Sequence, residues 1–474
     1  MTFLRFAVLI TGALLTAAAG SDPTRIGRVE TGLLPGQLIK GAPAPRYTIA
    51  ERLVHYKVPG VSVAVFENGE LAWAKGYGVV EAGSSAAVTP TTLFQAASIS
   101  KPVAAAGAMI LVERGKLALD EPVNPQLRSW KVADTELAKS EPVTLRRLLS
   151  HTAGLTVHGF RGYASNEEVP TLVQLLSGEP PSNSKRIEID IPPGSRHRYS
   201  GGGFSVAQQL MIDVAGKPFP DLMRELVLTP AGMKDSTYEQ PLPPALAGAA
   251  ATGHRSTGEA ISGKRHTYPE MAAAGLWTTP ADLARFALAM QKAWSGTAGA
   301  LVSRDTARLM LSPQPSSPTY GLGFGLNGEE FGHGGSNVGF KCTLVAYKDG
   351  RGAAVMTNGD RGSELAREIL QAISAEYGWP GYKPREREVV AVAPAVLQTY
   401  VGEYQFPDWV AVVTLEKEKL LLSVSGQGTF ELLAEAEDRY FAISPGIPPI
   451  RFVKDSAGKV TEFSAGALTG KKIR

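Results

Sequence analysis

The first regular hydrophobic pattern in the chain is a pair of strands. Residues 61–66 are apolar and rich in β-branched side chains, and residues 71–80 form a second such run. Asn68-Gly69 between them is typical of a two-residue hairpin turn. Helical patterns follow at residues 103–114, 143–149, 204–215 and 281–294. Thr279 and Pro280 supply an N-cap and a first helical residue for the last of these helices.

Strands return after this helical middle. Residues 341–347 and 352–357 flank Asp349-Gly350, a second hairpin signal, and residues 364–377 have an amphipathic helical pattern. The pattern lacks the strand–helix–strand alternation that is typical of a parallel sheet. We therefore predict an α+β fold, in which an antiparallel sheet takes strands from both ends of the domain and a helical insertion lies between them.

The C-terminal part of the chain has a different sequence pattern. Short strand-like runs separated by turn residues lie at residues 409–415, 420–424, 430–433, 440–443, 450–453 and 460–463. Such runs without helices predict a small antiparallel barrel or sandwich. We expect a main domain over residues 20–380, a linker over 381–393 that follows a Gly/Pro/aromatic stretch, and an all-β domain over 394–474.

The first nineteen residues have the pattern of a secretory signal peptide. Arg5 gives a positive start, residues 6–15 are apolar, and Ala17 and Ala19 form a small-residue cleavage site. We predict that residues 1–19 are removed and that the protein is secreted or periplasmic. An uncleaved anchor helix is the alternative. No later stretch is long and apolar enough to cross a membrane, so no stable span is expected after cleavage.

Composition and charge exclude several function classes. The 474 residues include 48 Lys plus Arg and 45 Asp plus Glu, with no polybasic run, which argues against a nucleic-acid partner. The single cysteine excludes an intrachain disulfide framework and a multi-cysteine zinc site. The seven histidines form no H-x-x-x-H or H-E-x-x-H pair, so we expect neither a metal nor a cofactor. A small molecule or a peptide is the expected substrate, and the oligomeric state stays open.

The candidate nucleophile is a serine followed three residues later by a lysine. This S-x-x-K pattern occurs three times, at Ser98–Lys101, Ser182–Lys185 and Ser456–Lys459, but only the first opens a predicted helix. There the two side chains share one face, and a buried lysine with a lowered pKa is able to take the serine's proton. The helix start also favours negative charge on a substrate oxygen. A serine N-cap followed by a solvated lysine is the alternative.

Two glycine-rich segments hold the other candidates. Tyr199 lies just before Gly201-Gly202-Gly203 at a predicted helix start, where a tyrosine is able to act as a proton shuttle or simply to pack a loop. His333-Gly334-Gly335-Ser336 precedes the predicted strand at 341–347. The glycines would let a substrate backbone pair with a strand edge, and His333 would donate a hydrogen bond or carry charge there. A glycine-rich turn with an incidental histidine is the alternative.

Taken in order, these three segments resemble the family of class C β-lactamases, penicillin-binding DD-peptidases, D-aminopeptidases and β-lactamase-like esterases. The resemblance covers residues 49–377 and includes the stretches 148–155, 274–283 and 320–324. It implies a β-lactamase/transpeptidase-like fold, Ser98 as the acylated nucleophile, Lys101 as its base and Tyr199 as the proton shuttle. His333, Gly334 and Gly335 would stand where the family has Lys-Thr-Gly or His-x-Gly, and the N–H groups of Ser98 and Ser336 would form the oxyanion hole. The region after residue 400 is similar to the lipocalin-like domain of some peptidase members.

Two departures bear on the substrate. The family's Tyr-x-Asn reads Tyr199-Ser200-Gly201 here, so the amide that binds the acyl group is missing, and His333 replaces a lysine. We predict an exported serine hydrolase that cleaves an amide or ester bond through acyl-Ser98, with a peptidase or amidase preferred. The alternatives are a carboxylesterase, a weak class C-like β-lactamase, a penicillin-binding sensor that acylates without turnover, and an acyltransferase.

Overall fold

The chain is described by a computed structural model over residues 22–407, 409–424, 428–443 and 447–474. The predicted signal peptide at residues 1–19 lies outside the described residues. Packing divides the chain into two units, the first built from Ile49–Ala366 and the second from Thr24–Thr48 together with Arg367–Arg474. The domain boundaries that the sequence suggested stay a prediction.

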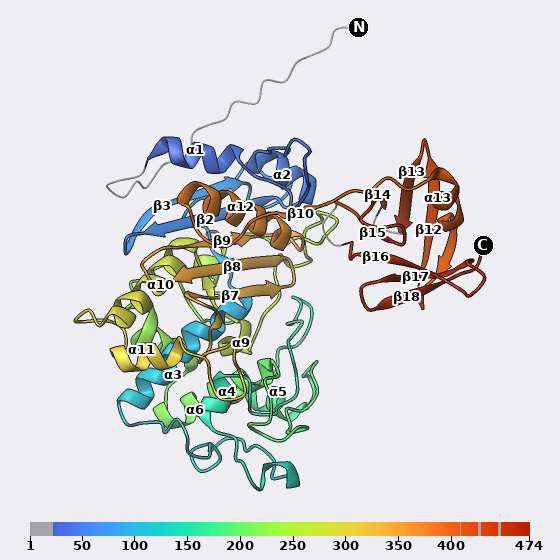
Figure 1. Ribbon diagram of the computed structural model, residues 1–474. Coiled ribbons are helices and arrows are strands. Elements are labelled where there is room, and N and C mark those ends of the chain that lie inside the picture. The colour runs from blue at the N-terminus through green and yellow to red at the C-terminus, as the bar shows by residue number, and fades with distance from the viewer. Residues whose placement is uncertain (1–21, 408, 425–427, 444–446) are drawn as a thin grey trace. The chain divides into compact units, whose positions relative to one another are not determined.

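The first unit contains a six-stranded antiparallel sheet with the strand order β3-β2-β9-β8-β7-β6 (Figure 1). Its strands are β2 (Gly60–Glu67), β3 (Glu70–Gly78), β6 (Gly325–Asn327), β7 (Glu330–Asn337), β8 (Phe340–Tyr347) and β9 (Gly352–Thr357). Val63 of β2 pairs with Val355 of β9, so the sheet joins the two ends of the unit. This confirms the predicted antiparallel sheet with strands from both ends.

The hairpin between β2 and β3 forms as the sequence predicts. Asn68 and Gly69 have φ values of 55° and 79°. Positive φ at both central residues is the geometry of a type I′ turn, whose twist matches that of the flanking strands. Asparagine and glycine are the residues that adopt it most easily, which is why this dipeptide is a reliable hairpin signal.

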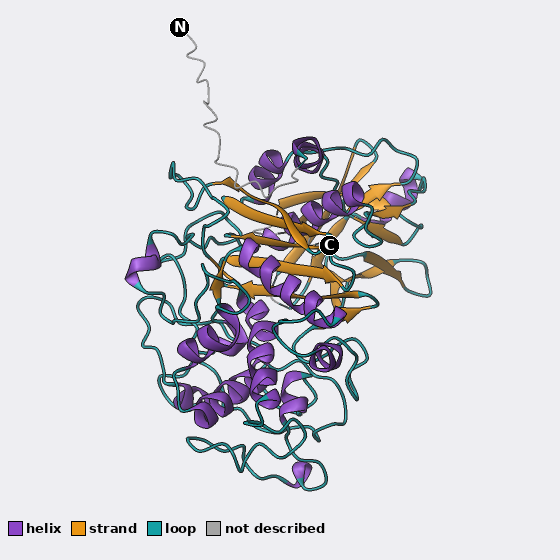
Figure 2. Cartoon of the chain, turned by 90° about the vertical axis from the view of Figure 1, so that its left-hand side faces the viewer, coloured by secondary structure: helices purple, strands orange, loops and turns teal. Residues whose placement is uncertain are grey.

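Helices form the second layer of the first unit. Figure 2 shows most of them, in purple, gathered below the orange strands. Nearly every residue of α3 is buried, which explains its alanine-rich, evenly apolar sequence. The remaining elements of the first unit are α2 (Ile49–Tyr56), β4 (Phe94–Gln95), η1 (Ala97–Ile99), α3 (Ser100–Glu113), η2 (Glu136–Ala138), α4 (Leu145–Leu149), α5 (Leu172–Ser177), α6 (Gly201–Ala215), α7 (Phe219–Met223), η3 (Arg224–Leu228), α8 (Pro244–Ala247), α9 (Met271–Ala274), β5 (Trp277–Thr278), α10 (Pro280–Ser295) and α11 (Arg304–Met310).

The second unit contains a closed antiparallel barrel, which decides between the barrel and the sandwich predicted from the sequence. Aromatic side chains fill its core, where the rings of Tyr400 and Phe452 stack with centroids 4.2 Å apart. The elements are α13 (Pro394–Tyr400), β11 (Gly402–Gln405), β12 (Val410–Glu416), β13 (Lys419–Val424), β14 (Gly428–Ala434), β15 (Arg439–Phe441), β16 (Ile450–Lys454), β17 (Val460–Ala465) and β18 (Leu468–Lys472).

Residues near the start of the chain complete the second unit. β1 (Gln37–Ile39) pairs in parallel with β10 (Arg385–Arg387), and α1 (Pro23–Thr31) is tied to the end of α12 (Gly362–Tyr377) by two hydrogen bonds from Arg28 to Glu376. The segment 381–393, expected to be a linker, therefore holds a strand whose partner lies about 350 residues earlier in the chain. Over the described residues, no helix has the length and apolarity needed to cross a membrane.

Candidate active site

All seven site residues predicted from the sequence line a single cavity of the first unit. The cavity has a volume of about 670 Å³, and its lining includes Ser98, Lys101, Tyr199, His333, Gly334, Gly335 and Ser336. These residues come from η1, α3, the segment just before α6, and β7, which together span more than 200 residues of the chain. The fold therefore brings together the three segments that the sequence singled out.

Ser98 lies in the short turn η1, between the buried strand β4 and helix α3. Ala97, the residue before it, has φ of 48°, a conformation that non-glycine residues seldom adopt. The Ser100 hydroxyl donates to the Ala97 carbonyl at 2.6 Å and accepts from the Leu276 N–H at 2.9 Å, which holds this backbone in place. The turn places Ser98 at the edge of the cavity, partly exposed, one turn before Lys101.

Lys101 has the position and the lowered pKa that a base for Ser98 requires. Its Nζ lies 3.0 Å from the Ser98 Oγ and donates to the Ala273 carbonyl of α9 at 2.8 Å. The side chain is only 2% exposed. Burial lowers the pKa of Lys101 from 10.5 to about 7, because the ammonium form loses its hydration. A substantial neutral fraction at neutral pH makes Lys101 able to accept the Ser98 proton.

Tyr199 lies on the other side of this pair. Its ring centroid is 4.9 Å from the Lys101 Nζ, and its hydroxyl shares a hydrogen bond with Ser98. Burial raises the pKa of Tyr199 to about 12, although the Ser98 hydrogen bond opposes the shift. The phenol is therefore protonated at neutral pH and is placed to give or relay a proton rather than to act as a phenolate.

The glycines after Tyr199 let the start of α6 pack closely against the loop at residues 156–160. A Cβ on Gly202 would lie 2.8 Å from the Thr156 carbonyl oxygen, and one on Gly201 would lie 3.0 Å from the Phe160 ring and 3.1 Å from the His158 carbonyl oxygen. Phe160 thus fills the space into which a side chain at position 201 would project. The wall of the cavity at this point is an aromatic ring and offers no amide.

β7 gives the cavity a strand edge with a free side. The short strand β6 pairs with β7 only from Glu330 to Gly332, so β6 leaves the stretch from His333 to Ser336 open on that side. Gly335 must lack a side chain, since a Cβ there would lie 2.3 Å from the Ala96 carbonyl oxygen and 2.5 Å from the Cys342 Sγ. Cys342 is buried, as expected for a small core residue.

Two residues of the site were not predicted, His151 and Tyr320. The His151 ring stacks beside Tyr199 with centroids 4.2 Å apart, and its Nε2 lies 3.2 Å from the Tyr320 hydroxyl. The same hydroxyl lies 3.0 Å from the His333 Nε2. The stretches 148–155 and 320–324, which contain the two residues, were the available signal.

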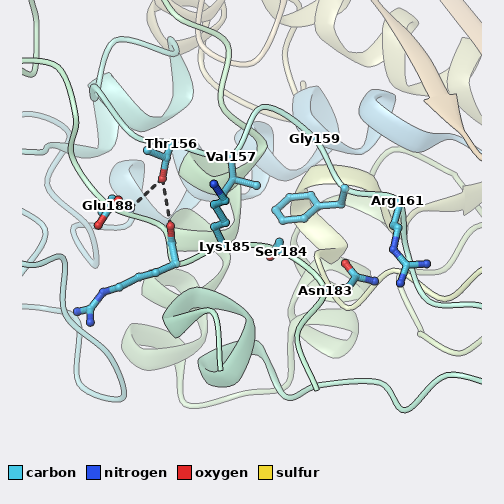
Figure 3. A pocket seen from close by; sticks show the side chains of 10 residues that line it. Thr156, Val157, Gly159, Arg161, Asn183, Ser184, Lys185 and Glu188 are labelled. Carbon is cyan, nitrogen blue, oxygen red and sulfur yellow. Dashed lines mark hydrogen bonds between the residues drawn. The ribbon is translucent and has the colours of Figure 1, made fainter. Parts of the chain in front are cut away.

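A second cavity of about 400 Å³ adjoins the first and shares Gly159 and Phe160 with it. Figure 3 shows its lining, including Arg161, Asn183 and Lys185, and the two hydrogen bonds of the Thr156 hydroxyl. The hydroxyl of Ser182, the second S-x-x-K serine, donates to the Ser184 carbonyl at 3.2 Å, and Ser182 lines neither cavity. Ser456 of the third pattern is exposed between β16 and β17.

The arrangement fits acyl transfer to a serine. In the described ranges no three His, Cys, Asp or Glu side chains come together in a way that could hold a metal. Nucleophile, base and proton donor are present, and the cavity has room for a substrate bound along a strand edge.

The comparison with known families agrees with this geometry. The family model described as Beta-lactamase matches residues 46–376, about 70% of the chain. This chain belongs to the beta-lactamase family. The match covers every residue of the cavity, and it confirms the family resemblance and the fold class predicted from the sequence.

The similar proteins differ in what their names say they do. Penicillin-binding protein 4* of Bacillus subtilis is 25% identical over 412 residues, which cover 80% of this chain and 87% of that protein. The teichoic acid D-alanine hydrolase of Staphylococcus aureus is 24% identical, over 58% of this chain and 66% of that protein. Esterase EstB of Burkholderia gladioli is 29% identical over 38% of this chain and 47% of that protein.

A solved structure shows the same fold. The octameric penicillin-binding protein homologue from Pyrococcus abyssi superposes with a TM-score of 0.60 at 22% identity, over 90% of this chain and 98% of that one. This beta-lactamase-family chain thus has relatives that are named as penicillin binders and relatives that are named as hydrolases.

Proposed function

We propose that the protein is an exported serine hydrolase that cleaves an ester or amide bond through an acyl-Ser98 intermediate. The observation that carries the proposal is the pair formed by Ser98 Oγ and a buried Lys101 Nζ 3.0 Å away, with the lysine pKa lowered to about 7. A lysine that is partly neutral at the working pH is what a weakly acidic serine needs as its base.

In the first step the Ser98 Oγ attacks the substrate carbonyl and its proton passes to Lys101. The N–H groups of Ser98 and Ser336, which both line the cavity, are the proposed donors to the oxyanion. Tyr199, protonated at neutral pH, lies where it gives a proton to the leaving alcohol or amine. Water then attacks the acyl-enzyme and restores Ser98.

The test follows Ser98 directly. The protein is mixed with a 4-nitrophenyl ester, quenched, and weighed by intact mass spectrometry, while product release is followed by absorbance. We expect an acyl adduct and steady turnover in the wild type and neither in Ser98→Ala. The matched control is Ser456→Ala, which changes the exposed serine of another S-x-x-K pattern and should keep full activity. Full activity in Ser98→Ala would refute the mechanism.

A second candidate is a sensor that is acylated and turns over slowly. It is favoured by the relatives named as penicillin-binding proteins and by Gly201, which leaves the acyl group without the amide partner that the family's asparagine supplies. A burst of one product per protein without a steady rate would favour the sensor. Adding amines or alcohols to the same assay detects an acyltransferase through new products.

A further inference from the structure

A chain of hydrogen bonds fixes the protons of His151 and His333. The backbone N–H of Ser200 donates to the His151 Nδ1 at 3.1 Å, so the proton of the neutral His151 lies on Nε2. Nε2–H donates to the Tyr320 hydroxyl at 3.2 Å, and that hydroxyl donates to the His333 Nε2 at 3.0 Å. The remaining His333 proton is on Nδ1, which donates to the Gly334 carbonyl at 2.6 Å.

These hydrogen bonds leave His333 without a free N–H group that could bind an anion. Both of its ring nitrogens are already hydrogen bonded, and neither points a free N–H into the cavity. Burial, and next to it the charge of Lys101, lower the pKa of His333 to about 3, which keeps the imidazole neutral. His333 therefore does not supply the positive charge that a lysine at this position would supply.

The remaining described residues of the lining offer no second lysine or arginine, and their other polar side chains include the uncharged Ser336, Asn337, Thr343 and Ser363. Lys101 is the one lysine or arginine among the described residues that line this cavity, and it is about half neutral near pH 7. Gly334 has no side chain, although a Cβ there would meet no atom within 4 Å. Phe160 occupies the space beside Gly201. The exposed His158 imidazole lies at the rim, with its ring centroid 4.9 Å from that of Tyr199.

A carboxylate that enters such a cavity loses its hydration without gaining a cation. An unpaired buried carboxylate is unfavourable by several kcal/mol, whereas an ester or amide group keeps most of its binding free energy. We infer that the hydrolase selects esters or amides that carry no free carboxylate beside the scissile bond. This inference rests on the proposed acyl-Ser98 function and names the substrate class for the same cavity.

The test compares two substrates that differ by one methyl group and by the negative charge that it removes: the 4-nitrophenyl monoester of glutaric acid and its methyl ester. Rates are taken at about pH 8 and constant ionic strength, where ordinary imidazoles are neutral. The rate of each ester without protein, which for the free acid includes attack by its own carboxylate, is subtracted. We expect kcat/KM for the methyl ester to exceed that for the free acid by about tenfold or more. Equal values, or a preference for the free acid, would overturn the inference.

A matched pair of variants tests the cause. His333→Lys and His333→Gln both replace the imidazole that accepts the Tyr320 hydrogen bond, but only the first adds a cation. His333→Lys should raise the relative kcat/KM of the free acid by about tenfold, while His333→Gln should keep the wild-type preference. If both variants shift the preference equally, the charge at position 333 is not its cause.

The same experiment separates this inference from the proposed function. If neither ester leaves an acyl group on Ser98, the proposed function fails. If both acylate Ser98 with equal kcat/KM, the function stands and the selectivity is wrong. The wild-type comparison needs no substitution, so a variant that fails to fold leaves the result decisive.

Discussion

Replacement of Lys101 by methionine should make the protein more stable, and by an amount that depends on pH. The buried amine has its pKa lowered from 10.5 to about 7. Between pH 7 and pH 10.5 the lysine is therefore protonated in the unfolded chain but largely neutral in the folded chain. The stability lost in this way is absent above about pH 10.5 and grows as the pH falls toward 7. Methionine has a similar volume and no charge, and removes the loss.

The magnitude follows from about 1.4 kcal/mol per pH unit. Near pH 7 this difference in protonation destabilises the wild type by about 4 kcal/mol, and near pH 9 by about 2 kcal/mol. Lys101→Met also leaves the Ala273 carbonyl without its 2.8 Å donor, which opposes the gain by about 1–3 kcal/mol at every pH. The difference between the two pH values cancels that constant contribution.

The measurement is urea unfolding of wild type and Lys101→Met at about pH 7, 8 and 9. The advantage of the variant should shrink by about 2 kcal/mol across this range, and its hydrolytic activity should be absent. Lys116→Met, which changes an exposed lysine after α3, is the control and should show no such trend. An advantage for Lys101→Met that stays constant with pH would mean that the amine keeps an ordinary pKa, and Lys101 would then be unsuited as the base.

Three further outcomes are expected. The acylation rate should rise with pH to a plateau, with a midpoint near the Lys101 pKa of about 7, and a flat pre-steady-state profile would contradict this assignment. Tyr199→Phe should lower kcat by about 10²- to 10³-fold with a smaller change in KM, as measured with an amide substrate whose leaving group needs a proton. Glu270 is fully buried, its carboxylate has no hydrogen-bond partner among the described residues, and burial raises its pKa to about 8. Between pH 4.5 and about 8 the folded chain keeps the Glu270 proton while the unfolded chain loses it, so the free energy of unfolding of the wild type falls as the pH rises through this window. In urea unfolding, the stability of Glu270→Gln relative to the wild type should therefore increase from pH 5 to 8, by up to about 4 kcal/mol. A constant difference between the two proteins would contradict the raised pKa.

Local signals in the sequence were sufficient for the elements that local interactions decide. Asn68-Gly69 predicted its hairpin because only a few residues adopt positive φ at two successive positions. Thr279 caps α10 as predicted, since its side chain accepts the Asp282 N–H at 3.2 Å. Ser98 and Lys101 could be paired because their spacing places them on one face of a single helical turn.

Elements decided by distant partners were missed. β18 is a polar strand whose one buried residue is Gly470, because the Phe406 ring covers the place of a Cβ there. A strand without an apolar face has no period-two signal. β10 is likewise three residues of Arg-Glu-Arg that become a strand through pairing with β1.

The site shows the same division. The candidates that belong to a motif lie together in one cavity, whereas no motif indicates the series of hydrogen bonds from His151 through Tyr320 to His333. The His151–Tyr320 hydrogen bond joins residues 169 positions apart, and the family-like stretches that contain them give no sign that the two side chains meet. Its consequence, a neutral His333 with no free donor, could be found only from the geometry.

Catalysis and selectivity in this cavity depend on one electrostatic condition. Lys101 suits the proposed role of base because no anionic group among the described residues contacts it: the contacts of its Nζ are Ser98, the Ala273 carbonyl and the rings of Tyr199 and Phe204. A substrate carboxylate brought within about 6 Å would favour the ammonium form by about 3 kcal/mol at an effective dielectric constant of about 20. Such a substrate would find no cation other than Lys101 among the described residues that line the cavity. Its charge would also keep Lys101 protonated, so that the lysine could not accept the Ser98 proton.

This coupling can be measured in the bound complex. The midpoint of the kcat–pH profile, which reports the enzyme–substrate complex, should lie about one to two pH units higher for the glutarate free acid than for its methyl ester. Single-turnover acylation of Ser98 by each ester gives the two profiles without interference from product release. The shift should disappear in His333→Lys, because the new ammonium group neutralises the substrate charge before it acts on Lys101. Equal midpoints in the wild type would separate selectivity from the state of Lys101 and refute the single electrostatic cause.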